Sequence, residues 1–320
     1  MSEETKNSPS VKKFPSSAVL LFGGASALLV FSIAKFTLDI DIKPSARIQA
    51  IRAILNPTPT PIPTPSAEVL AENVLPIAGY TVNIKWGDIG KKLVASGAID
   101  LTKYKENYKD PQYQELLKYL TADQDQGITI TQQNSYFWIN TLWALGLVQK
   151  SDVLDKGVMG TQYKKEVGNF ASTGGWTLGA KPATKLYSSA QIIPLTSEQN
   201  QMVVRIAENI YRPCCGNSTA FPDCNHGMAM LALIELMVSQ GYSETEIYQA
   251  GLAFNSYWFG QTYMDLAYYF KTKENLDWKN VDPKRALSAE FSSAQGYQAI
   301  KKQIEGVAPQ KPSTGGGCGA

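Results

Sequence analysis

Three of the four cysteines in this 320-residue chain fall within eleven positions, beside its only histidine. The side chains in segment 214–230 that could do chemistry are Cys214, Cys215, Cys224, His226, Met228 and Met230. Thiolates and imidazole are the preferred ligands of zinc, and thiolates with thioethers suit cuprous copper. The two methionines are as compatible with a core helix as with ligation. The segment therefore predicts a copper or zinc site.

A second interpretation assigns the same cysteines to thiol–disulfide exchange, which would make the chain a thiol–disulfide oxidoreductase. A helix is predicted to begin at Asp223 or Cys224 and to reach Gln240. If Asp223 caps it, Cys224 lies in the first turn, where free amides and the helix dipole stabilise a thiolate. Cys224 would then be the nucleophile, and Cys215 or Cys318 would resolve the mixed disulfide.

Cys318 lies in the tail STGGGCGA, whose Ser and Gly residues favour a flexible arm. Such an arm could bring a fifth ligand to the metal site, or offer a thiol to a partner protein. A third interpretation is an interaction domain without catalytic function, in which a disulfide such as Cys215–Cys224 only pins a loop. Adjacent cysteines such as Cys214 and Cys215 rarely bond to each other, because the ring would be strained.

Two partial resemblances accompany this segment. From Cys215 to Cys224, the sequence CGNSTAFPDC resembles the Cys-x2-Ser/Thr-x3-Pro-x-Cys part of the CDGSH iron–sulfur family, which implies a [2Fe–2S] cluster. The spacing of Cys214 and of His226 departs from that family, which disfavours the cluster here. Residues 214–259 are similar in layout to the periplasmic helical thiol proteins of cytochrome c maturation, although Cys-x-x-Cys is missing. That similarity implies thiol exchange with a client cysteine.

The elements that must position these residues are predicted to be mostly α-helical. Apolar residues recur at helical spacing, and strand-like alternation is confined to 80–84. Helices are predicted over 86–96, 111–121, 131–148, 196–211, 223–240, 243–270 and 282–305. Aromatic residues continue the helix that begins at 243 as far as 270. Thr196 with Gln199, and Ser243 with Glu246, match the capping-box pattern. The loop 169–180 is predicted to be a turn that packs Trp176, with ligand binding as the alternative.

The N-terminal part of the chain predicts a membrane tether. Residues 16–34 carry no charge and are flanked by lysines, which suits a single membrane-spanning helix. The Pro/Thr-rich stretch 56–66 favours an extended spacer. We therefore expect a short tail at 1–15, an anchor at 16–35, a linker at 36–66, a helical soluble domain at 67–308 and a flexible tail at 309–320. The short leading tail favours an extracytoplasmic domain at the cell membrane.

The charge balance and the absence of several catalytic motifs argue against some other classes of function. The chain has 30 Lys and Arg against 28 Asp and Glu, without a block of one charge, so nucleic acid is not an expected partner. No Ser-His-Asp order, metalloprotease helix or phosphate-binding glycine motif occurs. The expected partners are the membrane and a protein that exchanges thiols or metal.

Overall fold

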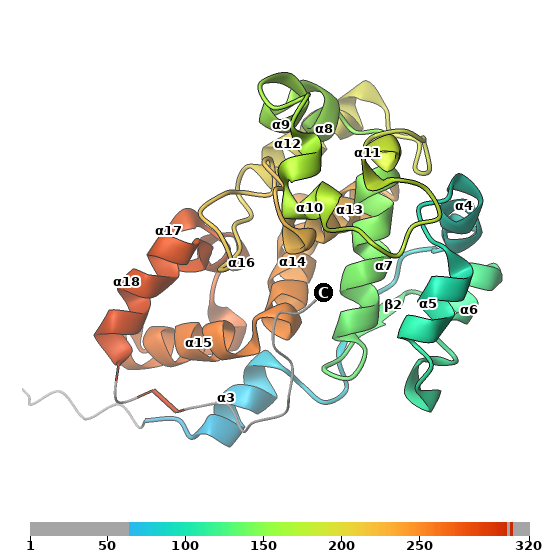
Figure 1. Cartoon of the computed structure of the whole chain (residues 1–320). Helices are drawn as coiled ribbons and strands as arrows, with labels where there is room; N and C mark the ends of the chain where they lie inside the picture. The colour runs from blue at the N-terminus through green and yellow to red at the C-terminus, as the bar shows by residue number, and fades with distance from the viewer. Residues whose placement is uncertain (1–63, 306–307, 310–320) are drawn as a thin grey trace, which may run out of the picture. The chain divides into compact units, whose positions relative to one another are not determined.

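The computed structural model describes residues 64–305 and 308–309, which form a mostly helical domain (Figure 1). The predicted tail, anchor at 16–35 and most of the linker lie outside the described residues, as does Cys318. In the part of the chain that is described, no helix combines the length and the apolar character needed to cross a membrane.

The first half of the domain contains short helices and one small sheet. Its strands, β1 (Tyr80–Val82) and β2 (Ile128–Ile130), pair antiparallel, with Thr81 opposite Thr129. The helices are α3 (Ala67–Val74), α4 (Ile89–Ser96), α5 (Leu101–Asn107), α6 (Lys118–Thr121), α7 (Ser135–Val148), α8 (Asp152–Lys156), α9 (Val158–Thr161), α10 (Ala171–Gly174) and α11 (Ala183–Leu186). Short 3-10 turns occur at Pro111–Tyr113 and Val167–Asn169.

The second half carries the longer helices. These are α12 (Ser197–Ala207), α13 (Asn225–Ser239), α14 (Glu244–Trp258), α15 (Gly260–Glu274), α16 (Pro283–Ala286), α17 (Ala289–Ser292) and α18 (Ala294–Ile304), with a 3-10 turn at Trp278–Asn280. Both predicted capping boxes are present, at Thr196 with Gln199 and at Ser243 with Glu246. Each cap satisfies amides that the first helical turn leaves free, which fixes where α12 and α14 begin.

Helices α7 and α13 form the centre of the core and run side by side (Figure 1). Both are apolar around most of their circumference, and nearly every residue of either helix is buried. Gly146 of α7 lies so close to α13 that an added Cβ would stand 2.2 Å from the carbonyl oxygen of Met228. The start of α13 is therefore held against a rigid neighbour, and side chains placed there occupy a fixed position.

Several predicted boundaries are wrong for local reasons. Helix α7 begins at Ser135 because Thr131 and Asn134 exchange hydrogen bonds between side chain and backbone before it. The predicted helix 111–121 is a 3-10 turn followed by α6. The aromatic run to 270 breaks at Phe259, which lies outside helical geometry and separates α14 from α15. The last predicted helix consists of α16, α17 and α18.

The loop around Trp176 packs as expected. Trp176 is buried, donates its indole N–H to the carbonyl of Ala98 at 2.8 Å and stacks edge-on against Trp143. The loop also contains the short helix α10, whose Ser172 amide donates to the carbonyl of Asp223 at 3.1 Å. This part of the chain therefore supports the segment that leads into α13.

Candidate metal and thiol site

The cysteine segment between α12 and α13 is anchored at several points. The Thr219 amide and hydroxyl both donate to the carbonyl of Ile210, at 2.8 and 2.9 Å. The Ala294 amide, at the start of α18, donates to the carbonyl of Cys215 at 2.8 Å. These bonds close the segment into a loop that returns to the first turn of α13. Cys214 is consequently held near Cys224, ten residues further along the chain.

Cys224, and not Asp223, is the N-cap residue of α13. Its backbone is extended, and its Sγ accepts from the amide of Gly227 at 3.4 Å. Of the two predicted starts of this helix, Asp223 and Cys224, the structure has Cys224, because the Asp223 carboxylate is bound to Arg212 and Asn217. The sulfur therefore takes the position in which an oxygen normally satisfies the free amides of a helix start. Negative charge on this sulfur is favoured by those amides and by the helix dipole.

Arg212 contributes a buried cation beside the same sulfur. Its side chain is 1% exposed, and its Nε donates to Cys224 Sγ at 3.0 Å. The guanidinium also donates to the carbonyls of Asn217 and Phe221, at 3.1 and 3.0 Å. A short ion pair of 2.5 Å joins its Nη2 to Asp223 Oδ1. A buried charge is tolerated when it is paired and hydrogen-bonded in this way.

Asp223 has both carboxylate oxygens engaged. Oδ1 accepts from Arg212, and Oδ2 accepts from the side-chain amide of Asn217 at 2.9 Å. The thiol of Cys215 also points toward Oδ1, at 3.7 Å. Asp223 thus neutralises Arg212 and orients the loop, which leaves Cys224 as the one sulfur bonded to the guanidinium.

Gly227 makes room for this cation. A Cβ at position 227 would stand 2.6 Å from Cζ of Arg212. The guanidinium thus lies directly against the backbone of the first turn of α13. Glycine is required here by close approach, and not by an unusual backbone angle.

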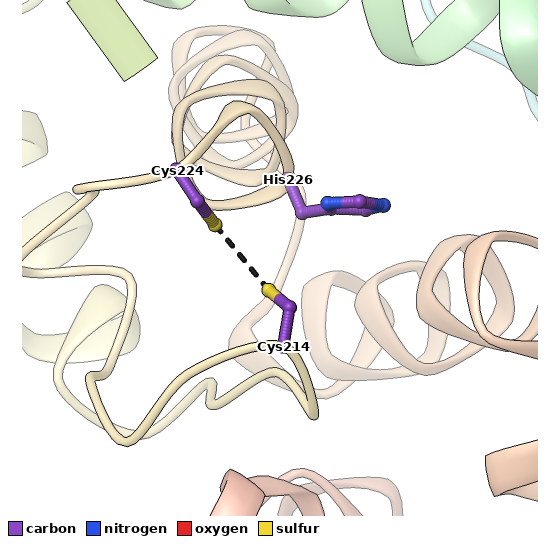
Figure 2. A group of neighbouring side chains, drawn as sticks. All are labelled: Cys214, Cys224 and His226. Carbon is purple, nitrogen blue, oxygen red and sulfur yellow. Dashed lines mark hydrogen bonds between the residues drawn. The ribbon is translucent and has the colours of Figure 1, made fainter. Parts of the chain in front are cut away.

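The sulfurs of Cys214 and Cys224 face each other at 3.4 Å (Figure 2). His226 comes from the same helical turn as Cys224, and its ring extends to one side of the line between the two sulfurs. The ligand atoms of Cys214, Cys224 and His226 all lie within 4.8 Å of one another. These three residues form a group that can hold a metal ion.

The ring of His226 is held by aromatic neighbours. It packs on Phe259 with ring centroids 4.3 Å apart and meets Trp258 edge-on at 5.8 Å. His226 is 6% exposed, whereas Cys214 is exposed. The group therefore has one buried wall, formed by α13 and the turn after α14, and one open side at Cys214.

The three thiols differ in acidity. The thiols of Cys214 and Cys215, together with the Arg212 guanidinium, hold the pKa of Cys224 well below its ordinary value, against the effect of burial. The pKa of Cys214 is raised, because its contacts with Cys215 and with the Cys224 thiolate favour the protonated form. For Cys215, contact with Cys214 lowers the pKa, but Cys224 and burial outweigh it, and the pKa rises to about 11. Cys224 is therefore the most acidic thiol of the cluster.

The remaining predicted site residues have different places. Cys215 belongs to a second group with Asp223 and Cys224, whose ligand atoms also lie within 4.8 Å. Met228 is fully buried against Gly146 of α7, and Met230 is buried beside Gly251 of α14, so both fill the core. The predicted Cys215–Cys224 disulfide is absent, since all three described cysteines are free.

The sequence interpretation missed Arg212, Asn217 and Gly227, and it did not foresee that Asp223 pairs with Arg212. A signal was available for Arg212, because a lone arginine stands two positions before the first cysteine of the cluster. Its burial was not foreseeable, since an arginine on an exposed loop has the same local sequence. Comparison of the chain with protein-family models, with curated proteins and with solved structures found no match.

Proposed function

We propose that this chain binds a copper or zinc ion through Cys214, Cys224 and His226, for storage or delivery at the extracytoplasmic face of a membrane. One observation carries the proposal: two sulfurs and an imidazole nitrogen from two separate segments lie within 4.8 Å of one another. Around zinc, with bonds of about 2.0–2.3 Å, such ligands would stand about 3.3–3.8 Å apart. A movement of about 1 Å would therefore close the site.

The charges near the site suit a soft cation. Arg212 and Asp223 neutralise each other, so the buried guanidinium does not repel an incoming ion. The thiolates of Cys214 and Cys224 would balance a divalent ion, and would leave one negative charge with cuprous copper. Both ions accept thiolate and imidazole ligands. Arg212 would serve as an outer partner that orients the Cys224 sulfur.

The first group is the better candidate of the two that share Cys224. In the second group, Asp223 has one oxygen bound to Arg212 and the other bound to Asn217. An ion there would have to displace a buried ion pair. Cys215 is therefore expected to contribute little to affinity, and it provides a matched control.

The open side at Cys214 favours exchange over permanent retention of the ion. Three protein ligands leave a fourth zinc position open, in contrast to closed structural sites with four protein ligands. Cys318 or a partner's thiol could occupy that position. Delivery to a partner would then proceed by replacing one ligand at a time.

A competition titration tests the proposal. The reduced full-length chain would be titrated with Zn²⁺ or Cu⁺ against a chromophoric chelator, and we expect about one ion per chain. Cys214→Ser, Cys224→Ser and His226→Phe should each weaken binding by more than about tenfold, because even the loss of an outer-shell partner costs that much. The phenyl ring preserves packing on Phe259. Cys215→Ser should lose much less affinity than these three variants, and unchanged binding in Cys224→Ser would refute the site.

A further inference from the structure

A different reaction is suggested by the unequal surroundings of the two facing sulfurs. Cys214 Sγ and Cys224 Sγ are 3.4 Å apart, so an approach of about 1.4 Å would bring them to disulfide bonding distance. Cys214 lies in the loop, and Cys224 is the N-cap of α13. Cys215, adjacent to Cys214, has its thiol directed toward Asp223 instead.

We propose that Cys214 and Cys224 form a reversible disulfide that oxidises client dithiols, with Cys214 Sγ as the atom attacked and Cys224 as the leaving group. Cys214 is exposed, so a client thiolate can reach it. Cys224 Sγ receives hydrogen bonds from Arg212 Nε at 3.0 Å and from the Gly227 amide at 3.4 Å. These donors stabilise the negative charge that develops on a departing sulfur.

This assignment reverses the roles that the sequence suggested. The sequence makes Cys224 the attacking nucleophile, but this residue is less exposed than Cys214, and its sulfur accepts hydrogen bonds from Arg212 Nε and the Gly227 amide. In the disulfide form, a client thiolate attacks the exposed residue, Cys214. The sulfur that leaves is Cys224, whose negative charge is stabilised by its hydrogen-bond donors. A disulfide whose reduced form is stabilised is a strong oxidant.

The reaction is an ordinary thiol–disulfide exchange, in which two electrons pass from the client to the protein. A client thiolate attacks Cys214 Sγ, which forms a client–Cys214 mixed disulfide and releases Cys224 as a thiolate. The client's second thiol loses its proton and attacks its own sulfur in the mixed disulfide, which releases Cys214. The client then holds a disulfide, and the protein holds a dithiol with the two electrons gained. A low-molecular-weight or protein disulfide must oxidise the dithiol again.

This activity does not depend on the metal proposal, although both use the same two sulfurs. A bound ion needs both thiolates, so ion and disulfide exclude each other. His226 contributes a ligand to the ion but no sulfur to the disulfide. The variant His226→Phe should therefore lose metal affinity while it keeps disulfide exchange, which separates failure of one proposal from failure of the other.

Mapping of mixed disulfides tests the proposal. The full-length Cys215→Ser, Cys318→Ser chain would be oxidised mildly with oxidised glutathione, mixed with reduced glutathione, quenched with acid and analysed by peptide mass spectrometry. We expect an intramolecular Cys214–Cys224 disulfide, and then glutathione on Cys214 in at least about tenfold excess over Cys224. Glutathione mainly on Cys224, or failure to form the disulfide, would overturn the proposal.

Variation of the leaving group provides a second test. In the same chain, Arg212→Lys removes the Nε contact with Cys224 while it keeps a positive charge. At equilibrium with glutathione, the disulfide should become about tenfold harder to reduce, because the released Cys224 sulfur loses its hydrogen bond from Arg212 Nε. Arg205→Lys, at an exposed arginine paired with Glu244, is the matched control. Equal equilibria in the two variants would contradict a role for Arg212.

Discussion

Arg212 Nε lies 3.0 Å from Cys224 Sγ, and the guanidinium that carries this nitrogen is almost completely buried. A cation fixed in this way stabilises one sulfur of the cluster and leaves Cys214, on the open side, in its ordinary thiol form. In the proposed metal site, this contact would give an incoming ion one ligand that loses its proton easily. In the proposed exchange reaction, it would stabilise the sulfur that leaves.

Arg212→Lys should raise the pKa of Cys224 toward its ordinary value. Lysine keeps the charge but lacks the planar fork that reaches the sulfur and Asp223 together. The parent should show one thiolate in its ultraviolet absorbance well below the pH at which an ordinary thiol titrates, and the variant should show that step at a higher pH. Arg205→Lys should leave the titration as it is. A coincident titration of parent and Arg212→Lys would disprove the contact's effect.

Gly227→Ala should displace Arg212, because the added methyl carbon would stand 2.6 Å from its Cζ. Overpacking of a buried site costs about 1–3 kcal/mol in the free energy of unfolding, and metal affinity should fall with it. Gly216→Ala is the control, since its methyl group would meet the end of the exposed Gln295 side chain, which can move away. Denaturant unfolding and chelator competition would measure both effects; equal losses in the two variants would argue against a specific role for Gly227.

Glu235, in the middle of α13, gives the domain a pH-dependent stability. Its carboxyl is fully buried, and burial raises its pKa to about 8, partly offset by the nearby Ser151 hydroxyl. Neither group has a hydrogen bond of normal geometry. The folded state therefore holds a proton that the unfolded chain, with a pKa of about 4.3, gives up earlier.

The free energy of unfolding should consequently fall as the pH rises from about 4.3 to about 8, by at most about 5 kcal/mol, and level off above that range. Glu235→Gln keeps the shape without the titration, so its stability curve should be flatter in this range. Denaturant unfolding at several pH values measures the slope. An equal slope in both proteins would show that Glu235 is not the titrating group.

The tether predicted at 16–35 has its own test. Replacing Leu28 and Val30 with lysine should release the chain from membranes, because each charge within the spanning segment costs up to about 2.5–3.5 kcal/mol of insertion free energy. The same two charges at Thr58 and Thr60, in the spacer, should have no effect. Alkaline extraction of membranes followed by immunoblotting distinguishes the outcomes, and continued membrane retention of the first variant would count against the anchor.

Local sequence was sufficient for the helices that begin with strong caps. Thr196 with Gln199 and Ser243 with Glu246 supply both halves of a capping box within four residues, so their positions could be predicted. The break at Phe259 could not, because it depends on how the turn packs against His226 from another helix. The strand Tyr80–Val82 was suggested by local alternation, but its pairing with residues 128–130 is a long-range contact.

In the candidate site too, some features could be predicted from the local sequence, and others depend on long-range contacts. Its cysteines and histidine could be recognised from the sequence by residue type. Cys214 and Cys224 come together because they lie only ten residues apart in the chain. Arg212 became part of the site only because Asp223 turns away from the helix cap to pair with it. With Asp223 paired to Arg212, Cys224 takes the place of the helix cap. This arrangement depends on the packing of Arg212 against Gly227, which no local sequence pattern indicates.

X-ray absorption at the metal edge tests the central claim most directly. The full-length chain, reduced and loaded with one equivalent of zinc, should show two sulfur ligands near 2.3 Å and at least one imidazole nitrogen near 2.0 Å. His226→Phe should remove the imidazole signal, and Cys215→Ser should leave the spectrum unchanged. A first shell with oxygen and nitrogen only, or an imidazole signal that persists in His226→Phe, would contradict the proposed site.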